Sequence, residues 1–170
     1  MKKPDIEARA RGVLEAHGLI EMAVDPIRLA NSLGIKVYNA KFGEADVHGL
    51  LAIRGGVPAI YVNADDSAVR KRFTVAHEIG HMNLHLTGGD VEFIDNADSF
   101  RSTIDPDSAW TEQRRKEWEA NIFAAALLMP DEQVRRRWVE IGDPEGMARW
   151  FQVSRTAMDI RLEGLGLLAA

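Results

Sequence analysis

One stretch of sequence decides how this chain is interpreted: Phe73-Thr74-Val75-Ala76-His77-Glu78-Ile79-Gly80-His81. Its two histidines stand four residues apart, so on an α-helix both imidazoles project from one face, about one turn from each other. Two imidazoles in that arrangement can bind one metal ion, and the His-Glu-x-x-His pattern on a helix is typical of zinc sites. We therefore expect His77 and His81 to be metal ligands.

Two other residues of this stretch carry information. Glu78 follows the first histidine and can reach a water molecule near the metal, so we expect it to be the catalytic general base of a hydrolase. Gly80 lies inside the predicted helix, where glycine costs about 1 kcal/mol relative to alanine. Its presence predicts that another backbone passes close to this turn.

Composition limits the classes of protein that the chain can belong to. Its 170 residues suffice for one domain with a sizeable core, and the net charge of −5 argues against general binding to nucleic acid or to a membrane surface. The chain has no cysteine, so histidine and carboxylate are the available strong metal ligands. Met1-Lys2-Lys3 is followed by Pro4 rather than by an apolar run, and no stretch has membrane-spanning length, which predicts a cytoplasmic protein.

The pattern of apolar residues predicts an α+β fold: N-terminal helices, a small antiparallel sheet packed with the metal-binding helix and a second ligand-bearing helix, and short C-terminal helices. We expect residues 1–130 to form a zincin-like metallopeptidase core. Residues 131–170 should form a helical region that resembles a helix-turn-helix and packs as one unit with this core. The expected elements are helices at about 5–17, 26–34, 67–85 and 111–128, and strands at 35–38, 48–53 and 59–62, the last two joined as a hairpin through Gly55-Gly56. Residues 87–109 are expected to be a long surface loop with a possible strand at 91–94.

A catalytic zinc ion needs a third protein ligand. His85 continues the four-residue series, but it lies about 12 Å along a straight helix from His77, so we favour a structural role for it. Glu117 and Asn121 share a face of the predicted helix 111–128. Glu117 could complete the site while Asn121 orients a ligand histidine. Glu119 is the alternative ligand.

A family resemblance covers most of the chain. Arg72 to His81, followed by Glu117-x-Glu-Ala-Asn121-x-Phe-Ala and Leu127-Leu128-Met129-Pro130, closely resembles the ImmA/IrrE family of zinc metallopeptidases. The resemblance implies a gluzincin-like core in which His77, His81 and Glu117 bind Zn²⁺ and Glu78 is the catalytic acid and base. It also implies a protein substrate, a helix-turn-helix (Xre-type) repressor or antitoxin, whose removal induces toxin–antitoxin, stress-response or mobile-element genes.

Several alternatives remain open from the residues alone. The C-terminal region could bind DNA, although its six arginines stand against seven acidic residues. The chain could also be a metal-binding regulator that acts by binding a partner with little intrinsic proteolysis. His48 and Tyr61 are conceivable oxyanion donors, though a structural role is favoured for both, and the strand 59–62 could pair with an extended substrate as a sheet edge.

Overall fold

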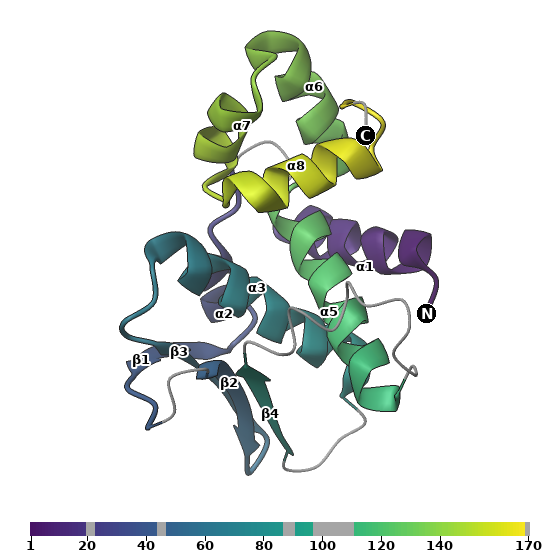
Figure 1. Cartoon of the computed structure of the whole chain (residues 1–170). Helices are drawn as coiled ribbons and strands as arrows, with labels where there is room; N and C mark the ends of the chain where they lie inside the picture. The colour runs from purple at the N-terminus through teal and green to yellow at the C-terminus, as the bar shows by residue number, and fades with distance from the viewer. Residues whose placement is uncertain (20–22, 44–46, 87–90, 97–110, 169–170) are drawn as a thin grey trace.

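The sheet and the C-terminal helices lie at opposite ends of the molecule, with α1, α2, α3 and α5 between them (Figure 1). The computed structural model describes residues 1–19, 23–43, 47–86 and 111–168, and the backbone of 91–96. The fold class is α+β, as predicted. Within the described residues, no helix combines the length and the apolar character that crossing a membrane requires.

Several helices begin at a residue whose side chain caps the first turn. In α2 (Pro26–Ser32) the side chain of Asp25 accepts hydrogen bonds from two backbone amides of the first turn, and Ser67 and Thr111 each cap one of the two long helices in the same way. The long helices are α3 (Ala68–His85) and α5 (Glu112–Leu128), while α1 (Lys3–Ala16) opens the chain. The C-terminal helices are α6 (Asp131–Ile141), α7 (Pro144–Phe151) and α8 (Arg155–Gly164).

The sheet has four strands in the order β1-β3-β2-β4. They are β1 (Lys36–Ala40), β2 (Val47–Arg54), β3 (Val57–Asn63) and β4 (Val91–Asn96). β2 and β3 form the expected hairpin, because Gly55 and Gly56 both have positive φ angles (55° and 77°), which suit a tight turn between twisted strands. β4 confirms the strand that was possible at 91–94, and the rest of the segment 87–109 lies outside the described residues.

The sheet is mixed rather than wholly antiparallel, because β1 runs parallel to β3. The chain reverses direction between β1 and β2 and again at the hairpin, and β3 then inserts between the two earlier strands, so it runs alongside β1 in the same direction. Because β3 lies between two other strands, the prediction that residues 59–62 form a free sheet edge for a substrate is wrong. β3 is paired on one side with β1 and on the other with β2.

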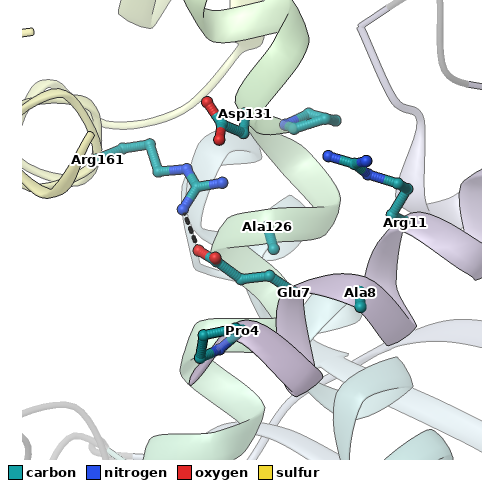
Figure 2. A pocket seen from close by; sticks show the side chains of 8 residues that line it. Pro4, Glu7, Ala8, Arg11, Ala126, Asp131 and Arg161 are labelled. Carbon is teal, nitrogen blue, oxygen red and sulfur yellow. Dashed lines mark hydrogen bonds and ion pairs between the residues drawn. The ribbon is translucent and has the colours of Figure 1, made fainter. Parts of the chain in front are cut away.

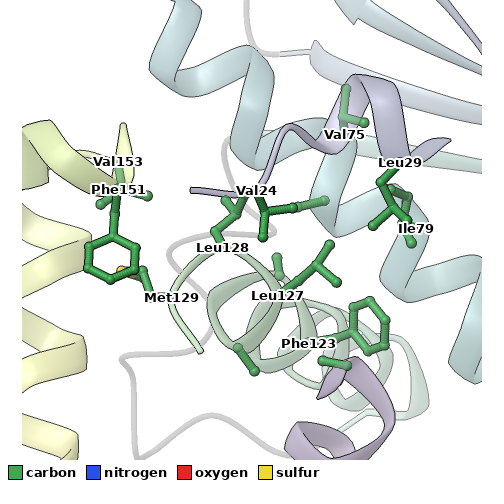
Figure 3. Close-up of a cluster of buried hydrophobic side chains, with 14 of the residues drawn as sticks. Val24, Leu29, Val75, Ile79, Phe123, Leu127, Leu128, Met129, Phe151 and Val153 are labelled. Atoms are coloured by element: carbon green, nitrogen blue, oxygen red, sulfur yellow. The ribbon is translucent and has the colours of Figure 1, made fainter. Parts of the chain in front are cut away.

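The hydrophobic core joins the helices to the sheet and to the C-terminal region. Val75 and Ile79 of α3 face Phe123 and Leu127 of α5, and all four side chains are fully buried (Figure 3). One continuous buried cluster includes these residues together with side chains of β2 and β3 and others from the C-terminal helices: Leu51, Ile60, Val134, Met147, Phe151, Met158 and Leu162. Burial of this apolar surface is the main favourable term in folding.

Helices α3 and α5 approach closely at Gly80. A Cβ atom placed there would lie 3.2 Å from the backbone oxygen of Ala120 and 3.3 Å from Cβ of Phe123. The expectation that another backbone passes this turn is therefore confirmed, and the passing backbone belongs to α5. A side chain at position 80 would force the two helices apart by a few tenths of an ångström.

A buried arginine fastens the C-terminal helices to the rest of the chain. Arg161 of α8 donates from Nε to the backbone oxygen of Met129 at 3.0 Å. It also donates from a terminal nitrogen to Glu7 Oε1 of α1 at 2.5 Å, the contact that Figure 2 shows. Its side chain is only 6% exposed. The division of the chain at residue 130 stays a prediction, and this contact supports the expectation that both parts pack as one unit.

Replacing this arginine tests that expectation. We expect Arg161→Met to lower the free energy of unfolding by about 1–3 kcal/mol, because the Met129 carbonyl loses its charged donor. Urea unfolding followed by circular dichroism would measure the loss, and a single transition is expected for the wild type. Arg149→Met on the surface of α7 is the control and should leave the midpoint near that of the wild type. An equal midpoint for both variants would contradict the role of Arg161.

Candidate metal centre

The helix α3 brings two histidine side chains into the interior. His77 and His81 are 0% and 1% exposed, and their rings meet edge to face with centroids 4.6 Å apart. Their Nε2 atoms lie 3.0 Å from each other. The four-residue spacing therefore places two nitrogen donors at one point, as the sequence predicted.

The third donor comes from α5. Glu117 Oε2 lies 3.1 Å from Nε2 of His77 and 3.4 Å from Nε2 of His81. The other oxygen of this carboxylate accepts a hydrogen bond from Gln113 Nε2 at 2.5 Å, which fixes its orientation. Among the described residues, His77, His81 and Glu117 are the one set whose ligand atoms all lie within 4.8 Å of one another.

These three donors fit a zinc ion in both chemistry and spacing. Nitrogen and oxygen ligands of tetrahedral zinc stand about 2.0–2.1 Å from the ion, and hence about 3.3 Å from each other. The three donor atoms lie 3.0, 3.1 and 3.4 Å apart. The spacing also suits other divalent ions that accept imidazole and carboxylate, so it defines a metal site without identifying the metal.

Asn121 indicates which nitrogen of His77 carries hydrogen. Its Oδ1 lies 2.9 Å from His77 Nδ1, and an amide oxygen can only accept, so Nδ1 is the donor. In the neutral ring Nε2 then carries the lone pair, directed at the Glu117 carboxylate. A lone pair and a carboxylate repel each other at this distance unless a proton or a metal cation lies between them, so the arrangement suits a positive charge at this point.

Burial and the mutual contacts of the donors shift their pKa values. Burial is the main cause that lowers the pKa of His81 from 6.5 to about 4, because it disfavours the charged imidazole. Burial acts to raise the pKa of Glu117, but the contacts with His77 and His81 outweigh it, so the pKa lies below its ordinary value of 4.5. At neutral pH His81 is therefore neutral and Glu117 is ionised, which are the protonation states that a metal ion needs.

Glu78 lies next to this triad, on the same helix, and is fully buried. Strand β2 passes directly over it at Gly49. A Cβ atom at position 49 would overlap the methyl group of Thr74 and lie 3.3 Å from Oε1 of Glu78. The strand also carries a register shift towards β4 between Val47 and Gly49. Gly49 thus lets the strand backbone come close to the carboxylate.

The sequence of the chain matches the model of a known protein family. The Peptidase_M78 family model, described as the IrrE N-terminal-like domain, matches residues 30–163. The chain belongs to this family. The match covers both helices of the triad and most of the C-terminal helices. It supports the interpretation of the triad as a metal site of an IrrE-type protein.

Comparison with solved structures identifies a similar fold. A Mycobacterium tuberculosis transcriptional regulator matches with a TM-score of 0.65 and 20% sequence identity, over 94% of this chain. The present chain spans 46% of that regulator, so less than half of its length. No curated protein sequence matches the chain.

The other candidate residues lie outside the triad. His85 Nδ1 is 3.1 Å from His81 Nδ1, and His85 Nε2 is 2.9 Å from Glu119 Oε2. Glu119, the alternative ligand, therefore points to His85, and its other oxygen contacts the amino group of Met1. His48 pairs through Nδ1 with Asp66 Oδ2 at 2.9 Å, and Tyr61 stacks on Tyr38 with centroids 5.4 Å apart. These contacts agree with the structural roles favoured for His48 and Tyr61.

Two residues of the site were missed by sequence reasoning, although each had a signal. Gln113 precedes Glu117 by four residues and so shares its helix face, which is the same spacing that pointed to Asn121. Gly49 is an isolated glycine inside a strand pattern, and such a glycine often marks a close approach of another group.

The contact at Gly49 yields a prediction with a built-in control. We expect Gly49→Ala to destabilise the protein by about 1–3 kcal/mol, because the new methyl group overlaps the buried Thr74 side chain. Thr74→Ser removes the overlapping methyl group. The double variant should therefore recover part of the loss in thermal or urea unfolding. If Thr74→Ser gives no recovery in the Gly49→Ala background, the proposed contact is not the cause.

The pKa of His81 predicts how the stability of the metal-free protein depends on pH. Between pH 6.5 and about 4, unfolded His81 binds a proton that the folded side chain does not bind, so the free energy of unfolding falls as the pH is lowered. Glu117 acts in the same direction at lower pH, because its pKa is also depressed on folding. Urea unfolding in the presence of a chelator should show this decline, and His81→Leu should flatten it between pH 6.5 and 4. An unchanged slope in that variant would exclude His81 as the source.

Proposed function

We propose that the chain is a zinc-dependent endopeptidase. The observation that carries this proposal is the convergence of His77, His81 and Glu117 beside Glu78 on the same helix. Membership of a peptidase family supports it. His77, His81 and Glu117 would hold the ion, and three protein ligands leave a fourth position open, as catalytic zinc requires.

The roles of the residues follow from this arrangement. A zinc ion held by His77, His81 and Glu117 would supply Lewis acidity, which polarises a scissile carbonyl and makes a water molecule more acidic. Glu78 accepts the proton of that water on a carboxylate oxygen and returns it to the leaving amine. Asn121 and Gln113 hold His77 and Glu117 in orientation through the 2.9 Å and 2.5 Å contacts. Burial of the site keeps bulk water away from these groups.

The proposed substrate is a protein, an Xre-type helix-turn-helix repressor or antitoxin. Its cleavage would derepress toxin–antitoxin or stress-response genes. The support is the family resemblance of the two motifs. A cytoplasmic location is part of the same proposal, because such a repressor acts there.

Direct binding to nucleic acid is not part of the proposal. Four arginines of the C-terminal helices lie close to acidic groups of the same region. Arg135 pairs with Asp131, Arg137 with Glu140, and Arg155 with Asp159. Arg149 lies 3.6 Å from Glu145. Such pairing reduces the positive potential that attachment to phosphates requires.

The metal ligands can be tested without a substrate. We expect Glu117→Gln to lose zinc during purification or to weaken its binding strongly, because an amide is a neutral and poorer ligand than a carboxylate. Metal analysis after dialysis and competition with a chromophoric chelator would measure this. Glu112→Gln, in the exposed first turn of the same helix, should keep one zinc per chain. Full zinc retention in Glu117→Gln would remove that residue from the ligand set.

The catalytic role of Glu78 is tested with a purified helix-turn-helix repressor of the proposed substrate class. We expect Glu78→Gln to keep its zinc and to cleave the purified repressor at a rate reduced roughly 100- to 10,000-fold, the usual contribution of a general acid–base group. Gel electrophoresis and mass spectrometry of the fragments would follow the reaction. Release of the repressor from its operator by Glu78→Gln, without cleavage, would instead favour the alternative of a metal-binding regulator that acts by binding its partner.

A further inference from the structure

The third histidine of α3 has a place in the site although it is not one of the three converging donors. His85 lies one turn beyond His81, and its side chain is 4% exposed. One ring nitrogen faces His81 and the other faces Glu119 of α5, whose side chain is 7% exposed. The buried carboxylate of Glu119, the imidazole of His85 and the imidazole of the metal ligand His81 therefore form one continuous row of contacts.

Glu119 determines which nitrogen of each imidazole in this row carries the hydrogen. An ionised carboxylate only accepts hydrogen bonds, so Nε2 of His85, at 2.9 Å, is the donor. A neutral imidazole carries one N–H, which leaves a lone pair on Nδ1 of His85. That lone pair faces Nδ1 of His81 at 3.1 Å, so Nδ1 of His81 must donate the hydrogen between them.

The consequence appears on the other side of the His81 ring. With hydrogen on Nδ1, the lone pair of His81 is on Nε2, and this atom lies 3.0 Å from Nε2 of His77 and 3.4 Å from Oε2 of Glu117. A hydrogen on Nε2 instead would point into the triad and would remove His81 as a ligand. The direction of the hydrogens set by Glu119 is therefore the one that a metal ion at the triad needs.

We propose that Glu119 and His85 are positioning residues that act in sequence, Glu119 on His85 and His85 on His81, to hold His81 in its metal-binding tautomer. The three residues are called the His81 relay below. The proposal rests on the metal site of the proposed function but not on peptide hydrolysis. Neither Glu119 nor His85 touches the metal or a substrate in this role.

The other ligand histidine, His77, is held by a single direct hydrogen bond to α5. Asn121 of α5 accepts directly from Nδ1 of His77 at 2.9 Å. Helix α5 therefore supplies a ligand, Glu117, an acceptor for His77, Asn121, and an acceptor for His85, Glu119. His81 differs from His77 because its own acceptor is the imidazole of His85 on α3, which in turn donates to the carboxylate of Glu119. Carboxylate–histidine–metal arrangements raise the basicity of the ligand nitrogen and fix the orientation of the ring.

Zinc affinity is the first test, measured with the full chain by competition with a chromophoric chelator. We expect His85→Leu and Glu119→Leu to raise the dissociation constant for zinc roughly 10- to 100-fold, the usual effect of losing such a partner. Glu119→Gln keeps an oxygen that can accept from His85 and should retain most of the affinity. Glu112→Gln on the same helix is the matched control and should bind zinc as the wild type does.

Two measurements separate positioning from general loss of structure. Because Glu119 acts through His85, the double variant His85→Leu/Glu119→Leu should bind zinc about as well as His85→Leu alone, whereas independent structural damage would add. Urea unfolding of the metal-free variants reports the damage itself. Equal losses of zinc affinity and stability in Glu119→Leu and Glu119→Gln would contradict the relay, because the second variant preserves the acceptor.

Nitrogen NMR of the histidine rings in the zinc-loaded wild type reads the tautomers directly. We expect His85 to carry its hydrogen on Nε2 and to have an unprotonated Nδ1, and His81 to carry its hydrogen on Nδ1. A His85 ring with hydrogen on Nδ1, or on both nitrogens, would overturn the relay. This observation does not depend on any variant and is unaffected by changes in stability.

The outcomes also distinguish the relay from the metal site on which it rests. If Glu117→Gln binds zinc as tightly as the wild type, the metal site of the proposed function fails, and the relay with it. If Glu117→Gln loses zinc while the His85 and Glu119 variants match Glu112→Gln, the relay alone fails.

Discussion

The close contact between α3 and α5 is the constraint on which the site depends. Gly80 lets the backbone of α5 pass at Ala120 and Phe123, with distances of 3.2–3.3 Å to a Cβ atom placed at that glycine. Each helix carries its polar residues at four-residue spacing, so each presents a short polar row within an otherwise apolar contact. Only when the helices are this close do the rows of His77 and His81 and of Glu117 and Asn121 meet within hydrogen-bond distance.

Burying so many polar groups is costly unless each finds a partner. The network around the triad provides these partners largely from α5. Gln113, Glu117, Glu119 and Asn121 all face groups of the same network, and the surrounding apolar cluster of Val75, Ile79 and Phe123 holds the two helices in place. Packing and polar contacts therefore support each other, since a shift of either helix would leave several buried polar groups without partners.

The sheet covers the side of α3 that carries Glu78. β2 reaches Glu78 because position 49 has no side chain, and its hairpin partner β3 is enclosed between two neighbours. The backbone of β2 thus covers the carboxylate of Glu78. On the far side of the helices, Arg161 links α8 to α1 and to the end of α5, so the C-terminal helices lie on the side away from the sheet (Figure 1).

The sequence by itself determined the local features: the two long helices and their caps, the hairpin, the pairing of His77 with His81, and Glu117 with Asn121 as the second motif. These follow from spacing along one helix or one turn, where neighbours in sequence are neighbours in space. Only the tertiary structure decided the parallel pairing of β1 with β3, the approach of Gly49 to Glu78, and the direction in which His85 and Glu119 point. Each of these joins residues at least 23 positions apart, and their contact depends on how helices and strands pack, which no local pattern encodes.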